Sequence, residues 1–208
     1  MGENPNSRLE AFCDGVFAIA LTLLIIDIRL PSSASILTTY EFWLALKSIV
    51  PSVLSFLLSF AIIFITWVNH HEALKLVNKS SPAFVYGNGL LLLGIVFIPF
   101  PTALLGDYIT TDHAAPAVVL YSAVCAFQAI GWNALTRAAI TAPPLTKDER
   151  SMVAMLRNHR YSYFAFVLYS VLAVLALWFP QAIAISISLI WILWFILSIT
   201  MNSDRGRA

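Results

Sequence analysis

The sequence predicts an all-α integral membrane protein with six transmembrane helices per chain. Of its 208 residues, 60% are hydrophobic and only 11% are charged, and the mean hydropathy is +0.83. A soluble domain carries roughly 25% charged residues because its surface must face water. One span needs roughly 20 apolar residues, so six spans use most of the chain. We therefore expect a single membrane-embedded domain over residues 1–208.

Proline and polar residues divide the apolar sequence into six segments. Pro31 follows the first segment, Pro143 the fourth and Pro180 the fifth. Pro99 and Pro101 should kink or end the third, because proline removes a backbone donor and clashes with the preceding turn. We predict helices over about residues 9–29, 41–76, 83–105, 116–140, 152–179 and 181–201.

The basic residues predict the orientation of these helices. With the N-terminus in the cytoplasm, ten of the 12 basic residues fall on the cytoplasmic side. These are Arg8, Lys75, Lys79, Arg137, Lys147, Arg150, Arg157, Arg160, Arg205 and Arg207. Only Arg29 and Lys47 fall on the other side. Basic residues concentrate in cytoplasmic loops, so we expect both termini in the cytoplasm.

The first predicted helix carries an apolar stripe. Ile19, Leu23 and Ile26 are spaced i, i+4, i+7 and share one face, with Phe12 and Thr22 close to it. Ordinary helix packing produces the same pattern. A functional alternative is a hydrophobic constriction around a symmetry axis, which would gate ions by dewetting. The stripe covers roughly 10 Å of helix rise, enough for two or three stacked rings.

Polar residues near helix ends form a second group of candidates. Asp14 lies just before the uninterrupted apolar run and needs an internal partner. His70 and His71 end the second helix on the same side, so we expect one of them to meet Asp14 and to respond to pH. Asn88 begins the third helix and can join this cluster, or it can simply hold helices together.

Several classes of function are disfavoured. Histidines at i, i+1 point about 100° apart, so we expect no metal site at His70 and His71. The net charge of +1 offers no basic stripe for nucleic acid. The chain has no P-loop and no carbonyl filter loop, and we expect neither an enzyme nor a cofactor. Arg157 and Arg160, at the start of the fifth helix, are expected to anchor it and to contact lipid phosphate.

The opening of the first helix resembles a known signature. The residues Arg8-x-x-x-Phe12-Cys13-Asp14 are similar to the Arg-x-x-x-Phe-Ser-Asp signature of the transmembrane protein 175 family of potassium channels, with Cys13 in place of serine. Two further runs, Trp67–His71 and Pro99–Thr102, look like the prokaryotic branch of that family.

The resemblance implies a homotetramer in which the first helix of each subunit lines a central pore. It implies a pore constriction at Ile19, Leu23 and Ile26, with Ala18 and Thr22 adjoining it. It also implies a network that packs the first helix against its neighbours. This network comprises Arg8, Phe12, Cys13, Asp14, Trp67, His70 or His71, and Asn88.

We therefore predict a passive, potassium-permeable cation channel in the plasma membrane of a bacterium, with permeant K⁺ and other monovalent cations, membrane lipid and three copies of itself as partners. A hydrophobic constriction in the pore need not exclude protons. One alternative is a proton-coupled transporter of small solutes or ions that uses Asp14 and a histidine of the second helix. Another is a membrane-embedded enzyme or metal-binding protein built on His70, His71 and Asp14.

Overall fold

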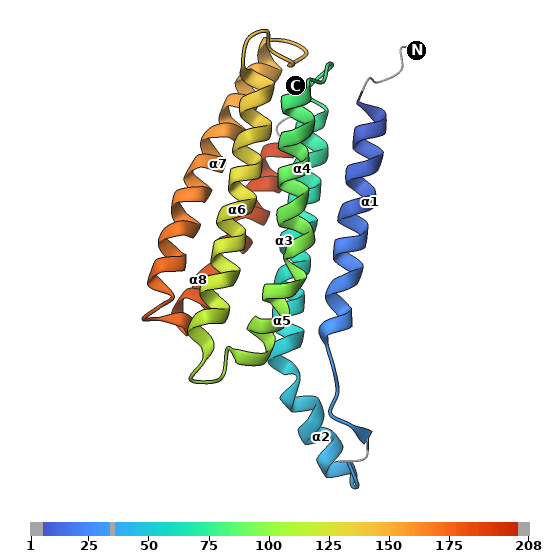
Figure 1. The fold of residues 1–208 in the computed structure, drawn as a ribbon, viewed down its shortest axis with the longest axis vertical. Coiled ribbons are helices and arrows are strands. Elements are labelled where there is room, and N and C mark those ends of the chain that lie inside the picture. Colours follow the sequence, from blue (N-terminus) through green and yellow to red (C-terminus); the bar gives the residue numbers. More distant parts are fainter. Residues whose placement is uncertain (1–5, 34–35, 204–208) are drawn as a thin grey trace.

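The computed structural model describes residues 6–33 and 36–203 and is entirely helical apart from its loops. Nearly parallel rods run along the long axis of the molecule (Figure 1). In chain order the helices are α1 (Ser7–Leu23), the short 3₁₀ helix η1 (Leu24–Asp27), α2 (Thr39–Ser48), α3 (Val50–Leu74), α4 (Pro82–Phe97), α5 (Pro99–Tyr108), α6 (Ala114–Ile140), α7 (Glu149–Leu175) and α8 (Pro180–Ser203). The predicted all-helical fold class is confirmed.

Two of the predicted helices end or break where the sequence had not indicated it. We expected one helix over residues 9–29, but α1 ends at Leu23 and tightens into η1, as helix ends often do. We expected one helix over residues 41–76, but Ile49 separates α2 from α3. The physical reason is Pro51 in the first turn of α3, whose ring clashes with a continued helix.

The other predicted bounds shift by a few residues. The break between α4 and α5 falls at Ile98, directly before Pro99, in the region where prolines were expected to end or kink the helix. The remaining helices were expected over residues 116–140, 152–179 and 181–201. In the structure α6 begins two residues earlier than expected, α7 three residues earlier and α8 one residue earlier. Segment α7 starts early because Asp148 caps it: the Ser151 backbone N–H donates to Asp148 Oδ1 over 2.7 Å.

Four helical stretches are long and apolar enough to cross a membrane. They are Ser7–Asp27, Thr39–Leu74, Pro82–Tyr108 and Ala114–Ile140. A shorter apolar stretch, Pro180–Trp194, lies in α8. The charged first turns of α7, with Arg150, Arg157 and Arg160, lower the hydropathy of an otherwise apolar helix. The chain is thus a multi-pass membrane protein.

Helix α6 occupies the centre of the bundle. It packs against α4, α5, α7 and α8, and Figure 1 shows it among them. Its contact with α4 is close because both helices offer glycines: a Cβ on Gly131 would lie 2.5 Å from Leu91 Cα, and one on Gly87 would lie 2.8 Å from the Leu135 backbone nitrogen. Small residues let transmembrane helices approach in this way.

Several polar side chains inside the bundle are hydrogen-bonded to one another. Ser59 Oγ lies 2.7 Å from Thr102 Oγ1 and 2.9 Å from Tyr121 Oη, which ties α3 to α5 and α6. Gln128 Nε2 donates to Thr66 Oγ1 over 2.8 Å and ties α6 to α3. Such pairs keep buried polar groups satisfied where lipid offers no partner.

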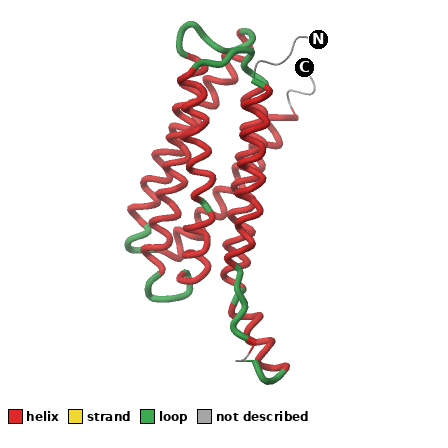
Figure 2. The backbone as a smooth tube through the Cα atoms, turned by 45° about the vertical axis from the view of Figure 1, so that its right-hand side comes forward, coloured by secondary structure: helices red, strands yellow, loops and turns green. Residues whose placement is uncertain are grey.

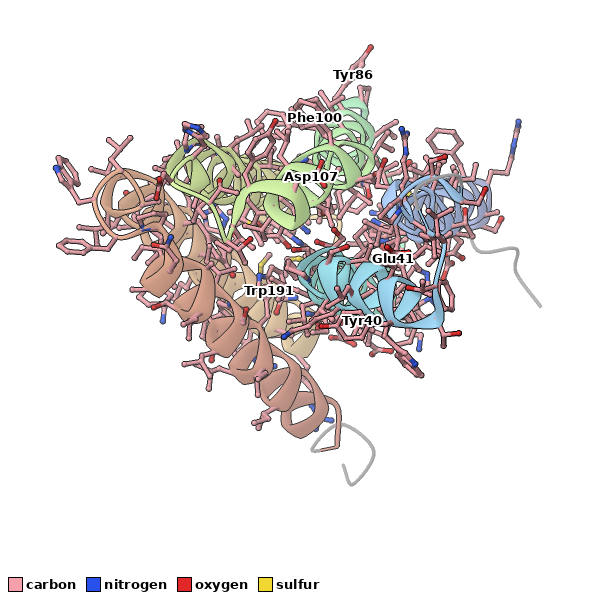
Figure 3. All side chains as sticks on the ribbon, turned by 90° about the horizontal axis from the view of Figure 1, so that it is seen from below. Tyr40, Glu41, Tyr86, Phe100, Asp107 and Trp191 are labelled. Carbon is pink, nitrogen blue, oxygen red and sulfur yellow. The ribbon has the colours of Figure 1, made fainter. Side chains whose placement is uncertain are left out.

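The lower end of the molecule is formed by α2 and the segment that leads into it, and α2 extends beyond the other helices (Figures 1 and 2). Tyr40 and Trp43 on this helix are 71% and 66% exposed. From below, Tyr86 of α4 projects away from the bundle, whereas Trp191 of α8 lies in its interior (Figure 3). Trp191 stacks on Tyr169 of α7 with ring centroids 6.1 Å apart.

At the upper end, the loop after α3 and the loop after α6 are joined. Val77 and Thr146 form an isolated antiparallel bridge. The Asn78 backbone N–H donates to Leu145 O over 3.1 Å, and the Lys147 N–H donates to Leu76 O over 3.0 Å. These bonds hold the α3–α4 turn against the α6–α7 turn.

Candidate functional site

One face of α1 is built into the protomer. Cys13, Phe17, Ala20 and Leu24 recur at helical spacing and are at most 1% exposed. They pack against α3 and α4, the main neighbours of α1. This stripe fixes the rotation of α1 about its own axis, and therefore fixes which residues face away from the bundle.

The opposite face of α1 is open and apolar. The predicted constriction residues Ile19, Leu23 and Ile26 are 59%, 39% and 59% exposed, and Phe12 is 63% exposed. Thr22 is exposed on the same face, and its hydroxyl donates to Ile19 O in its own helix over 2.8 Å. Ala18 and Arg8 are also exposed. The residues expected to form or adjoin the constriction thus share one uncovered face of the protomer. Arg8 and Phe12 were expected to pack α1 against its neighbours, but within one protomer both are exposed.

Asp14 is anchored by tryptophan and not by histidine. Trp67 Nε1 on α3 donates to Asp14 Oδ1 over 2.8 Å. The expected pair between Asp14 and His70 or His71 is wrong: among the described residues, neither histidine hydrogen-bonds this carboxylate. Trp67 lies one turn before His71 on α3, and its long indole reaches α1 first.

The hydrogen-bond partner of His70 lies on α4. The His70 Nε2–H donates to Asn88 Oδ1 over 2.7 Å, and Asn88 Nδ2 donates to the Phe84 carbonyl over 2.8 Å. Cys13 Sγ lies 4.0 Å from the same Asn88 oxygen, a long contact for the residue that replaces the signature serine. Asn88 on α4 therefore contacts α1 through Cys13 and α3 through His70, and within the described residues no hydrogen bond joins it to Asp14 directly.

His71 makes a separate contact with α1. Its Nδ1 lies 2.9 Å from Glu10 Oε1, and its ring stacks on Trp67 with centroids 6.1 Å apart. Trp67 and His71 are i, i+4 neighbours and face α1 together, whereas His70 is rotated by about 100°. The first turns of α1 are thus held to α3 by two polar contacts, one above the other.

The sequence did not indicate two residues of this network. Glu10 was not assigned to His71, although its position one turn before Asp14 put it on the same side of α1. Phe17 packs on His70 with ring centroids 5.4 Å apart; its spacing of four residues from Cys13 was the available signal. His70 also meets Trp132 of α6 at 6.2 Å, a contact between helices that no local pattern predicts.

The chemistry available at these residues is structural. Among residues 6–33 and 36–203, no group of three or more His, Cys, Asp or Glu side chains is placed to hold a metal ion. Glu10, Asp14 and Asn88 are each paired with a side chain of α3. This arrangement positions a helix; it presents no nucleophile with an adjacent base.

A multi-pass helical bundle that fixes one face of its first helix and leaves the other face open fits the class of membrane channel subunits. Comparison with known proteins supports the same class. The family model described as "Endosomal/lysosomal potassium channel TMEM175" matches residues 8–99. The chain is 38% identical over 179 residues, 85% of its length, to a protein named as a potassium channel in Chamaesiphon minutus, and it covers 88% of that protein.

Structural comparison agrees. The crystal structure of a lysosomal potassium-selective channel TMEM175 homolog from Chamaesiphon minutus superposes with a TM-score of 0.79 and 36% identity, covering 93% of this chain and 97% of that one. The protein from Gallus gallus named as an endosomal/lysosomal proton channel TMEM175 is 31% identical over 125 residues, 58% of this chain and 25% of that protein. This chain belongs to the TMEM175 family.

Membership confirms the predicted resemblance and the predicted class of function. The family is one of ion channels and not of enzymes. The relatives named above are channels and give no support to the transporter alternative. Nothing in these relatives or in the described residues points to a cofactor.

Proposed function

We propose that the protein is a potassium-permeable cation channel whose pore is lined by α1 from four copies of the chain. The observation that carries the proposal is the open apolar face of α1, where Ile19, Leu23 and Ile26 remain exposed although the opposite face is buried. A pore-lining helix needs one face packed on its own subunit and one face directed at the symmetry axis. The family relationship supports potassium as the permeant ion.

The selectivity of such a pore comes from partial dehydration. Rings of Ile19, Leu23 and Ile26 offer no oxygen ligands, so a cation must shed water to pass between them. Thr22 and Ala18 adjoin these rings and leave more room. The Thr22 hydroxyl proton is already donated to Ile19 O, so its oxygen presents lone pairs toward the axis. Such a constriction also leaves a path for protons, in keeping with the relative from Gallus gallus, which is named as a proton channel.

We place six transmembrane rods in the cell membrane with both termini in the cytoplasm. The six rods are α1 with η1, α2 with α3, α4 with α5, α6, α7 and α8. Six crossings return the chain to the side on which it began, and the basic residues gather at that end. The surrounding lipid and three further subunits complete the expected partners.

Leu23→Ala tests the constriction. Potassium flux is measured in liposomes with no coupled ion gradient, and the variant should conduct several times faster because a narrow apolar ring has been widened. Leu189→Ala on α8 is the matched control, since Leu189 is 61% exposed and lies outside α1. Equal flux from wild type and Leu23→Ala would contradict the placement of the constriction.

The mass of the purified protein in mild detergent tests the assembly. A tetramer has four times the 23.0 kDa of one chain. A protein that stays monomeric while conducting potassium in liposomes would overturn the shared pore, because one copy of α1 cannot enclose a channel.

A further inference from the structure

Helix α7 carries two arginines on the side that faces away from the bundle. Arg157 and Arg160 are exposed, whereas Met155, Ser162 and Tyr169 on the opposite side are buried. The rotation of α7 is fixed at this level by a polar contact, because Thr136 Oγ1 of α6 lies 2.9 Å from His159 Nδ1. Because His159 faces α6, helical spacing turns Arg157 and Arg160 away from the bundle.

The two arginines lie where the polar part of α7 gives way to its apolar part. Beyond them the outward face continues with Phe164, Val171 and Leu175, all exposed apolar residues. About 22 Å of helix rise separates Arg160 from Leu175, which is most of a ~30 Å hydrocarbon core. Arginine side chains at this depth extend along the helix to reach the headgroup region.

Aromatic side chains mark the same level. Tyr161 follows Arg160 directly, is 38% exposed, and meets Trp194 of α8 edge-on with ring centroids 6.0 Å apart. Tyrosine and tryptophan gather at membrane–water interfaces, where an apolar ring and a polar tip are both accommodated. The pair therefore places Arg157 and Arg160 at the headgroup boundary independently of helix length.

The charges of these arginines are not neutralised within the described part of the protomer. Its ion pairs join Glu10 to His71 and Glu72 to Lys75. Arg150, in the first turn of α7, has an acidic neighbour. That neighbour is Asp148, and the Ser151 N–H together with the charge of Arg150 lowers the pKa of its carboxyl. Arg157 and Arg160 are left for an anion from outside the chain.

We propose that Arg157 and Arg160 form a binding site for the phosphate of an anionic phospholipid, bordered by Tyr161 and Trp194 and distinct from the pore face of α1. Guanidinium groups match phosphate oxygens with two parallel donors each. A headgroup is the phosphate source that this depth favours, because Phe164 and Val171 below the arginines contact the acyl chains of the same lipid. The site makes α7 a lipid-binding helix and leaves ion passage to α1.

The test uses the full-length protein in mild detergent and native mass spectrometry with two lipids of identical acyl chains, phosphatidylglycerol and phosphatidylcholine. Wild type should bind phosphatidylglycerol more tightly than phosphatidylcholine. R157Q/R160Q should weaken phosphatidylglycerol binding by about thirty-fold, as expected from loss of two basic residues at a membrane surface. Its binding of phosphatidylcholine should stay unchanged, and gel filtration should show the same assembly as wild type.

R29Q/K47Q is the matched control, because it removes two exposed basic residues from the other end of the molecule. An equal loss of phosphatidylglycerol binding in both double variants would show general charge attraction and overturn the site. No preference for phosphatidylglycerol in wild type would overturn it as well. Inorganic phosphate at millimolar concentration should compete only weakly; full displacement would indicate an ion site in place of a lipid site. Potassium flux, measured separately, reports on the pore alone.

Discussion

Helices α1 and α6 are both apolar enough to cross a membrane, yet they are packed in opposite ways. α6 is surrounded by α4, α5, α7 and α8, and it buries most of its length. α1 lies at the side of the bundle against α3 and α4 (Figure 1) and leaves Ile19 and Ile26 more than half exposed. Within one chain, α6 is therefore largely covered by other helices, whereas α1 keeps an exposed face, which the proposed tetramer would direct at the pore.

Side-chain size accounts for much of this difference. α6 meets α4 through Gly131 and Gly87, where the neighbouring backbone leaves no room for a Cβ. Gly15 on α1 has no atom of the protomer within 4 Å of the position its Cβ would take. Both helices are apolar enough to span a membrane, so hydropathy alone does not reveal which one is buried. The space around their glycines does, because it is filled at Gly131 and open at Gly15. Three substitutions test the contrast.

The largest effect is expected from Gly131→Ala on α6. The added methyl would lie 2.5 Å from Leu91 Cα, so α4 and α6 must move apart, at a cost of about 1–3 kcal/mol or more. Thermal unfolding in detergent should show a clear loss of stability. Gly89→Ala on α4 is the control because nothing lies within 4 Å of its Cβ position. Equal unfolding temperatures for both variants would contradict the close packing of α4 and α6.

An intermediate effect is expected from Trp67→Phe, which keeps an aromatic ring but removes the donor to Asp14. A hydrogen bond to a charged group contributes about 1.5–3 kcal/mol, so α1 should separate from α3 more often. The two native thiols report this motion: Cys13 lies on α1, Cys125 lies on α6, and both are buried.

Maleimide labelling of Cys13 should therefore become roughly tenfold faster or more in Trp67→Phe, whereas labelling of Cys125 should keep its wild-type rate. Equal acceleration at both thiols would show that the whole bundle has loosened, and would remove the distinction between a peripheral α1 and a central α6.

The smallest effect is expected from Gly15→Ala. In one protomer the added methyl meets open space, and alanine favours the helix by roughly 0.5–1 kcal/mol over glycine. Thermal unfolding should show no change or a slight gain. A marked loss of stability in the assembled protein, measured beside its oligomeric mass, would instead locate a close contact between subunits at Gly15.

The sequence was informative where a local rule decides the outcome. Hydropathy predicted the all-helical membrane fold, and Pro99 marked the break between α4 and α5 because a proline disrupts any helix. The candidate residues Asp14, Trp67, His70 and Asn88 came from three helices and do gather at one end of α1.

The partners within that cluster were not predictable from spacing. Which side chain meets Asp14 depends on the rotation of α3 against α1, and that rotation is set by packing along the full length of both helices. It turns Trp67 and His71 toward α1 and His70 toward α4. The break at Ile49 was missed for a related reason, since Pro51 is compatible with the first turn of a new helix as well as with a kink.

The open face of α1 also affects the stability of a single subunit in the membrane. In water, Ile19, Leu23 and Ile26 together would drive aggregation, but in a bilayer lipid tails cover them without loss. A single subunit can therefore remain in the membrane without exposing this apolar face to water. In the tetramer that we propose, tight fit between helices would have to bring the subunits together, and this face would meet water and ions only after assembly.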